Sequence, residues 1–276
     1  MCKKYLLASE LEKIELRFNV RLDPSFEAIS KSYAVSSGDY SYVITRENTN
    51  HLEVHRFGMT PYFAKEQMNI INARSEGDKN SRNDPDYTGS KSIFLKTPFM
   101  KPMQAQRCLV IADAYYEWSD QKKPHLVFLQ HRNRPFAFAG IYDRWQNPET
   151  KEVVTSFAII TTVANSMLRS IGVKRMPVVL ARINEMEWIK PSNHLSHVLR
   201  LLEPCPSEVM NCYPVSDMVS IQGTNDPAML NPAGDKLLPE TIPVRISNGY
   251  RSHKEKHPAN SPTLEERMTL SNRNNP

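Results

Sequence analysis

Hydrophobic and polar residues alternate with a period of two along much of the chain, and this alternation is typical of half-buried β-strands. Residues 52–56, Leu-Glu-Val-His-Arg, show it most clearly. By this pattern and by runs of β-branched and aromatic residues, strands are predicted at residues 40–45, 52–56, 107–113, 125–130, 136–141, 157–162, 177–181 and 213–216. Residues 77–90 are rich in Gly, Asp, Asn, Ser and Pro, which predicts an exposed loop.

Helical periodicity is limited to short stretches. The run from Ser9 to Glu12 has the spacing of a capping box, and it precedes a helical face with Leu11, Ile14 and Phe18. A second short helix is predicted around residues 26–33 and another at residues 196–202. Many strands with few helices favour an α+β fold: a single domain with a largely antiparallel, barrel-like β core and peripheral helices.

The chain has 276 residues, and 40% of them are hydrophobic, which is enough for a sizeable core. We find no internal repeat and no clear linker, so one domain over residues 1–247 is predicted. Residues 248–276 are basic and polar with little to bury, and they are predicted to form a mobile tail.

Charge and cysteine content narrow the functional classes. A net charge of +5 is compatible with a polyanionic partner. The four cysteines show neither a CxxC pair nor the His-Cys spacing of a zinc site, so no structural metal and no cofactor are expected. Few thiols favour a reducing, cytoplasmic location. No apolar run has the length of a membrane span or a signal peptide.

Cys2 follows the initiator Met1, and removal of Met1 would leave an amine and a thiol on one terminal residue. Such an amine has a pKa of about 8 and a free thiol one of about 8.5, so both are partly nucleophilic at cell pH. An amine condenses with an aldehyde, and a neighbouring thiol can then close a ring on the imine. The alternative is that Cys2 is incidental to a frayed terminus.

Three further clusters carry polar groups that are suited to chemistry. Residues 71–76 contain the amide Asn72 and the guanidinium Arg74, which suits phosphate. In residues 107–118, Glu117 follows an apolar strand among aromatic residues, where burial would raise its pKa and suit it to acid–base catalysis. The third cluster follows the strand at 157–162, and its Arg175 could hold a phosphate. Each also has a structural interpretation as a surface or ion-paired residue, and Asp113 is expected to be a turn residue.

Taken together and in order, these stretches resemble the SRAP family, the SOS-response-associated peptidase-like proteins. The resemblance covers roughly residues 2–220. It is carried by Cys2 and by residues 56–61, 72–76, 107–118, 138–140, 161–165 and 175–178.

The resemblance implies one α+β domain that captures abasic sites in single-stranded DNA, acting as a monomer without a metal. Cys2 would form an imine and then a thiazolidine with the sugar aldehyde, Asn72 would orient the amine and Glu117 would shuttle protons. The DNA-binding residues that it implies are Lys3, Lys4, Phe63, Arg74, Ser75 and Arg175. Arg74 and Arg175 would hold phosphates, Lys4 replaces a usual Arg, and Phe63 would stack on a base.

One departure concerns a histidine that the family usually carries shortly before the Arg of its Arg-Met-Pro stretch. Here residues 171–174 are Ile-Gly-Val-Lys, and Val173 takes the expected place. Crosslinking should persist while release of the DNA slows, and Val173→His should speed release. Two alternatives stay open: a thiol peptidase limited to self-cleavage, and a non-catalytic single-stranded DNA-binding protein.

Overall fold

The computed structural model describes residues 2–131 and 134–239, so the boundary at residue 247 and the tail at 248–276 lie outside the described residues. Its core is a closed barrel in which β11, β10, β7, β4 and β5 follow one another and β5 pairs again with β11. The bounds are β4 (Tyr40–Thr45), β5 (His51–Phe57), β7 (Arg107–Ala112), β10 (Phe136–Gln146) and β11 (Val153–Val163). This barrel confirms the predicted α+β fold with a barrel-like core.

Short strands extend the barrel sheet. They are β2 (Arg21–Leu22) beside β5, and β6 (Asn72–Arg74) and β12 (Arg175–Pro177) beside β11. Neighbours along the barrel pair antiparallel, whereas β5 and β6 pair parallel to β11. The ends of β6 and β12 therefore meet at the same part of β11, which brings two distant sequence stretches together.

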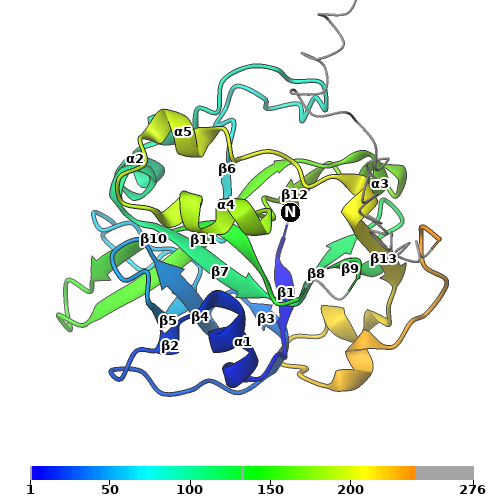
Figure 1. Cartoon of the computed structure of the whole chain (residues 1–276), viewed down its shortest axis with the longest axis horizontal. Helices are drawn as coiled ribbons and strands as arrows, with labels where there is room; N and C mark the ends of the chain where they lie inside the picture. Colours follow the sequence, from blue (N-terminus) through cyan, green and yellow to red (C-terminus); the bar gives the residue numbers. More distant parts are fainter. Residues whose placement is uncertain (1, 132–133, 240–276) are drawn as a thin grey trace, which may run out of the picture. The chain divides into compact units, whose positions relative to one another are not determined.

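A second, antiparallel sheet lies beside the barrel in the order β13, β9, β8, β1 and β3 (Figure 1). Its strands are β1 (Lys4–Leu7), β3 (Ser32–Ser36), β8 (Ala114–Trp118), β9 (Pro124–Leu129) and β13 (Met210–Pro214). Asp113 stands between β7 and β8, and its carboxylate accepts hydrogen bonds from the backbone N–H groups of Ala8 (2.8 Å) and Ser9 (2.7 Å). Asp113 is thus a turn residue, as expected, and it fixes the exit of β1.

Tyr5 of β1 connects the second sheet to the barrel. Its ring makes edge-on contacts with Phe57 of β5 and Phe138 of β10, at centroid distances of 5.6 and 5.9 Å. Such pairs contribute about 0.5–1.5 kcal/mol each beyond the burial of their area. The strand that carries the amino-terminal residues is therefore held by packing as well as by hydrogen bonds.

The helices are peripheral: α1 (Leu11–Phe18), α2 (Thr97–Ala105), α3 (Ser166–Ser170), α4 (Arg182–Ile189) and α5 (Leu195–Leu199). The described part of the chain also has four single-turn 3₁₀ helices: η1 (Ile93–Leu95), η2 (Ser207–Val209), η3 (Asp217–Ser220) and η4 (Pro227–Leu230). Helix α4 packs against β7 and β10, and Trp188 donates its indole N–H to the Cys108 carbonyl at 3.0 Å. All six positions of β7 are buried as a result.

Some local predictions were wrong. The capping box does not form, because the Ser9 hydroxyl bonds Asp113 and the N-cap is Glu10 with no side-chain cap. The helix predicted around residues 26–33 is absent, since residues 23–31 are irregular and β3 begins at Ser32. The strand predicted at 177–181 instead lies at Arg175–Pro177. The loop predicted at 77–90 is present and mostly exposed, although it buries Asn80.

Among the described residues, none of the helices is long and apolar enough to cross a membrane. The same part of the chain holds no cluster of three or more His, Cys, Asp or Glu side chains suited to a metal ion.

Candidate active site at the start of β1

Cys2 lies just before β1 and is fully buried. The register of β1 on β8, with Tyr5 opposite Tyr115, leads the chain back toward Glu117 at this end. Burial raises the pKa of the Cys2 thiol well above its usual range, and the nearby Glu117 carboxylate raises it further. The thiol therefore keeps its proton at neutral pH unless a neighbouring base removes it.

Asn72 lies against the backbone of Cys2. Its side-chain Nδ2 donates to the Cys2 carbonyl at 2.9 Å. Its Oδ1 is buried and accepts no hydrogen bond from the residues that the structure describes. A buried amide oxygen without a donor is unusual and favours a role in binding. An acceptor is thus available next to the residue whose nitrogen would be freed by loss of Met1.

Glu117 lies on β8 and is 2% exposed. Burial raises the pKa of its carboxyl to about 7, against a smaller opposing effect of nearby positive charges, Lys3 among them. The carboxyl is buried, as the sequence indicated, and its charge is coupled to the Cys2 thiol. A carboxyl that titrates near neutral pH can both accept and return a proton.

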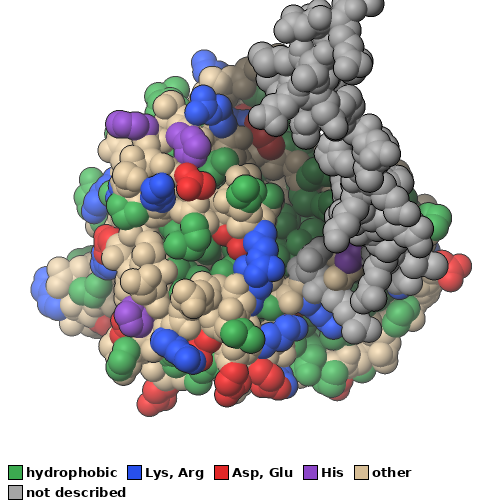
Figure 2. All heavy atoms as spheres, viewed as in Figure 1, with side chains coloured by type: hydrophobic (Ala, Val, Ile, Leu, Met, Phe, Trp, Pro, Cys, Tyr) green, Lys and Arg blue, Asp and Glu red, His purple; other side chains and the backbone are tan. Residues whose placement is uncertain are grey.

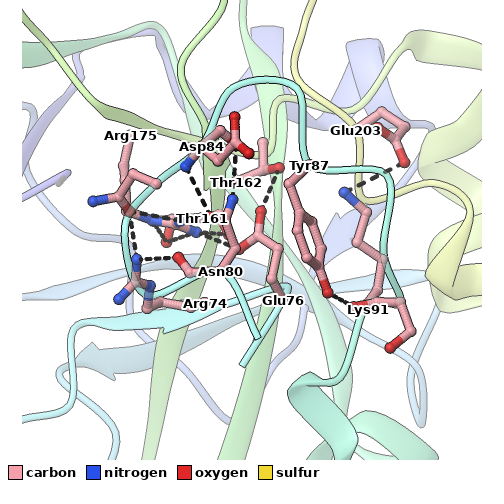
Figure 3. A network of polar contacts seen from close by, with 12 residues as sticks. Arg74, Glu76, Asn80, Asp84, Tyr87, Lys91, Thr161, Thr162, Arg175 and Glu203 are labelled. Carbon is pink, nitrogen blue, oxygen red and sulfur yellow. Dashed lines mark hydrogen bonds and ion pairs between the residues drawn. The ribbon is translucent and has the colours of Figure 1, made fainter. Parts of the chain in front are cut away.

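Two arginines meet on the strands that pair with β11: Arg74 ends β6, the strand that begins with Asn72, and Arg175 begins β12 (Figure 3). Arg175 is almost fully buried, and its Nη2 bonds the Glu76 carboxylate and the Thr161 carbonyl, each at 2.8 Å. Its Nη1 donates to Asn83 Oδ1 at 3.2 Å, and Arg74 donates to the same oxygen. One amide oxygen therefore occupies the point on which two guanidinium groups converge.

Strand periodicity explains why the side chains of Asn72 and Arg74 lie on the same side of β6. Residues two apart on a strand face the same side, so both side chains project from one side of β6 while Ala73 is buried on the other. Ser75 follows with its side chain fully buried and its backbone N–H on the Thr161 carbonyl. The structure therefore places Asn72, Arg74, Ser75 and Arg175 along one stretch of β11.

The remaining predicted residues are distributed differently. Lys3 is exposed and its charge reaches Glu117. Lys4 is opposite Tyr116, and its ammonium donates to the Val219 carbonyl at 2.7 Å, so the structure does not bring it to the Cys2 group. Phe63 is 47% exposed and contacts Tyr62 edge-on.

The face in Figure 2 is hollowed near its centre, with hydrophobic side chains inside and Lys or Arg side chains on the rim.

Sequence reasoning missed Glu76, Asn83 and Thr161. Glu76 lies within the stretch 71–76 but had no predicted role, and Asn83 lies in the loop that was predicted to be exposed. Its positive φ of 57° is a conformation that asparagine tolerates better than most residues. Asparagine in a Gly- and Asp-rich loop was the only available signal, and it does not indicate a contact with two arginines.

The geometry provides a thiol, an amide acceptor next to the adjoining nitrogen, a carboxyl that titrates near neutral pH, and two guanidinium groups. Once the Cys2 nitrogen is a free amine, this set suits the capture of an aldehyde that is attached to an anion.

Known proteins are similar to this chain in sequence and in fold. The sequence profile of the SOS response associated peptidase (SRAP) family matches residues 1–221. The abasic site processing protein YoqW of Bacillus subtilis is 32% identical over 239 residues, covering 83% of this chain and 99% of the relative. The abasic site processing protein HMCES of Gallus gallus is 27% identical, covering 64% of this chain and 56% of the relative.

A crystal structure of a protein from Bacteroides thetaiotaomicron superposes with a TM-score of 0.71 at 26% identity, covering 84% of this chain and all of that chain. The profile match spans most of the chain and begins at its first residue, where the candidate site lies. This chain belongs to the SOS response associated peptidase (SRAP) family.

Proposed function

We propose that this protein recognises abasic sites in single-stranded DNA and links to them covalently through Cys2, after removal of Met1. The observation that carries this proposal is the contact of Asn72 with the Cys2 backbone beside the buried Glu117. The names of the relatives, which are abasic site processing proteins, support the choice of substrate. An open abasic sugar presents an aldehyde, the group that an amine and a thiol on one residue capture.

In the first step the Cys2 amine attacks the aldehyde carbon and one water leaves as the protonated imine forms. Asn72 Oδ1 would accept a hydrogen bond from the amine and so direct its lone pair to the sugar. Glu117 in its protonated form would supply the proton that the departing oxygen needs. This step uses the acid form of a carboxyl whose pKa is raised to about 7 by burial.

In the second step the thiol adds across the imine and closes a five-membered thiazolidine. The sulfur bonds to the carbon of the protonated imine, the electron pair of the C=N double bond moves to the nitrogen, and the nitrogen keeps the proton that it already carries. Because burial raises the pKa of the thiol, a base must remove the thiol proton, and the Glu117 carboxylate left by the first step would take it and return to its acid form. The same side chain therefore serves as acid and then as base.

The flanking phosphates would bind where Arg74 and Arg175 converge. Asn83 Oδ1 now lies at this point, and a phosphate oxygen would replace it there as the acceptor of both guanidinium groups. Arg175 would keep its ion pair with Glu76, which orients it. Lys3 would add positive charge at the rim of the site. The Ser75 backbone would help position the end of β6, which carries Arg74. Phe63 would offer a surface on which a base stacks.

A thiol peptidase is the rival function, as the family name suggests. Thiol peptidases rely on a thiolate, whose pKa is lowered by a neighbouring cation or helix terminus. Burial and Glu117 raise the pKa of Cys2 instead, which disfavours this role. The protein acts as a monomer in our proposal, and the size of the complex with DNA tests that point.

The test mixes the purified protein with single-stranded DNA in which a uracil has been converted to an abasic site. We expect a heat-stable protein–DNA band from the natural protein and none from Cys2→Ala. Cys205→Ala is the matched control, since it removes another buried thiol and should crosslink normally. A band of normal yield from Cys2→Ala would refute the mechanism.

A further inference from the structure

His125 lies directly across from Glu117 on the neighbouring strand. Strands β8 and β9 pair antiparallel, and Glu117 and His125 are Cα partners in that ladder. Side chains of directly opposed residues project from the same face of a sheet, with Cβ atoms about 4.5–5.5 Å apart. The two side chains therefore share one face of the sheet.

One hydrogen bond orients the imidazole of His125. Its Nδ1 lies 3.0 Å from the Lys123 carbonyl oxygen, which can only accept a hydrogen bond. Nδ1 must then carry the proton, and Nε2 is left as the acceptor. The residue is half-buried, so part of its side chain meets solvent.

Glu117 needs a route by which protons reach solvent, because its proposed role requires it to gain and lose a proton while it is 2% exposed. The groups around it come from three elements. Cys2 and Tyr115 are fully buried and their pKa values are raised by burial, so they retain their protons. Lys3 is a cation on the β1 side, and Pro214 on β13 stands beyond His125. His125 is the neighbour whose side-chain type exchanges protons readily near neutral pH.

The position of the β8–β9 hairpin adds to this argument. The backbone N–H of Asp120, in the hairpin turn, donates to the Ile171 carbonyl at 3.1 Å. The turn at 171–174 is the place where the resemblance leads us to expect a histidine, but Val173 is buried among hydrophobic residues. The hairpin that carries His125 thus contacts this turn through Asp120.

We propose that His125 is a positioning residue that passes protons between Glu117 and solvent. The Glu117 carboxyl gives its proton to Nε2, the resulting imidazolium releases a proton to water, and the reverse sequence reloads the carboxyl. No electron or other group is transferred. This inference rests on the proposed function, and it changes the expectation for release of the DNA: reversal of the crosslink depends on His125 rather than on a histidine at residue 173.

The test measures rates of crosslink formation and of reversal for the natural protein, His125→Ala and His125→Gln, from pH 5.5 to 8.5. Reversal is followed by transfer to excess competing abasic DNA. We expect both variants to be slower in both directions by about 10-fold, which is less than the roughly 100-fold or more of a group that acts directly on the substrate, because His125 acts through Glu117. Millimolar imidazole in the buffer should restore the rate of His125→Ala, which has space for it, but not that of His125→Gln. Equal melting temperatures and equal binding of intact single-stranded DNA establish that folding and binding are unchanged.

His51→Gln is the matched control, because His51 is also half-buried on a strand and its Nδ1 bonds Asn48 away from the site. It should leave every rate unchanged. If the natural protein crosslinks and His125→Ala matches its rates, the proposal for His125 is wrong and the function stands. Slow rates that imidazole does not restore would assign His125 a structural role and also overturn the proposal. Failure of the natural protein to crosslink would refute the function itself.

Discussion

At the scale of single residues, burial acts in the same direction on Cys2 and Glu117. It raises the pKa of the thiol well above its usual range and that of the carboxyl to about 7. The higher pKa makes the Glu117 carboxylate a stronger base, whereas the higher pKa of the thiol makes its proton harder to remove, so ring closure depends on such a base. Asn72 adds direction rather than acidity, since its amide bonds the backbone of Cys2.

Replacement of Glu117 by Gln keeps the shape of the side chain but removes its ability to cycle a proton. We expect crosslinking to slow by roughly 100-fold at pH 7. In the natural protein the crosslinking rate should be greatest near pH 7, because imine formation uses the acid form of Glu117 and ring closure uses its carboxylate, whereas Glu117→Gln should lose this dependence. Single-turnover gel assays across pH 5.5–8.5 measure both effects. An unchanged rate in Glu117→Gln would make Glu117 a structural residue.

At the scale of secondary-structure elements, the site depends on strands that are too short to predict. Strand β6 has three residues and β1 has four, so neither shows enough alternation to be recognised. The residue types of the site could be predicted from the sequence, because Cys2, Asn72 and Glu117 are distinctive in their contexts. Their convergence could not, since it depends on the parallel pairing of β6 with β11 and on the register of β1 with β8.

Helix α4 shows a second reason for missed elements. Its buried positions include Glu185, which forms an ion pair with Arg17 of α1 at 2.9 Å. A hydrophobic pattern cannot indicate a buried position that is occupied by a charged side chain. Conversely, the helix predicted at 26–33 was inferred from Phe26, Ile29 and Tyr33, but Phe26 contacts His55 and Tyr33 belongs to β3.

The pairing of β6 with β12 through β11 predicts how DNA binding depends on salt. Three cations reach the site, Lys3, Arg74 and Arg175, while Lys4 is engaged by Val219. At about −0.7 per phosphate on single strands, the slope of log K against log salt should be about −2. Arg74→Ala should weaken binding equally across sequences and flatten the slope to about −1.4.

Titrations of fluorescent single-stranded DNA at several salt concentrations measure this slope. Arg144→Ala is the control, because Arg144 lies on β10 in a half-exposed pair with Glu47. It should leave the slope as it is. A slope that Arg74→Ala does not alter would remove Arg74 from the DNA-binding surface.

At the scale of the whole molecule, the barrel and the second sheet hold Cys2 from several sides. Tyr5 packs into the barrel, β8 and β3 flank β1, and Asn72 reaches Cys2 from β6. This rigidity encloses a carboxyl in an apolar setting, which is unfavourable for its ionised form. The stability of the fold should therefore depend on pH through Glu117.

The folded state raises the pKa of Glu117 from 4.5 to about 7, so it binds the proton more tightly than the unfolded chain does. This contribution to stability is fully present below pH 4.5 and is lost as the pH rises through about 7. The difference corresponds to at most about 3 kcal/mol of unfolding free energy. Between pH 5 and 8, the natural protein should lose up to this amount relative to Glu117→Gln.

Urea unfolding of both proteins at pH 5 and pH 8 measures the difference. The exposed Glu149 offers the control substitution Glu149→Gln, which should follow the natural protein at both pH values. Parallel behaviour of Glu117→Gln and the natural protein would show that Glu117 ionises normally in the folded state.

Intact-mass spectrometry of the protein with a short single-stranded DNA that carries one abasic site tests the central claim most directly. The account predicts a free protein that lacks Met1, and a single adduct whose mass is the sum of that protein and the DNA minus one water. Fragmentation should place the DNA on Cys2. A protein that keeps Met1, or an adduct attached to a lysine, would contradict it.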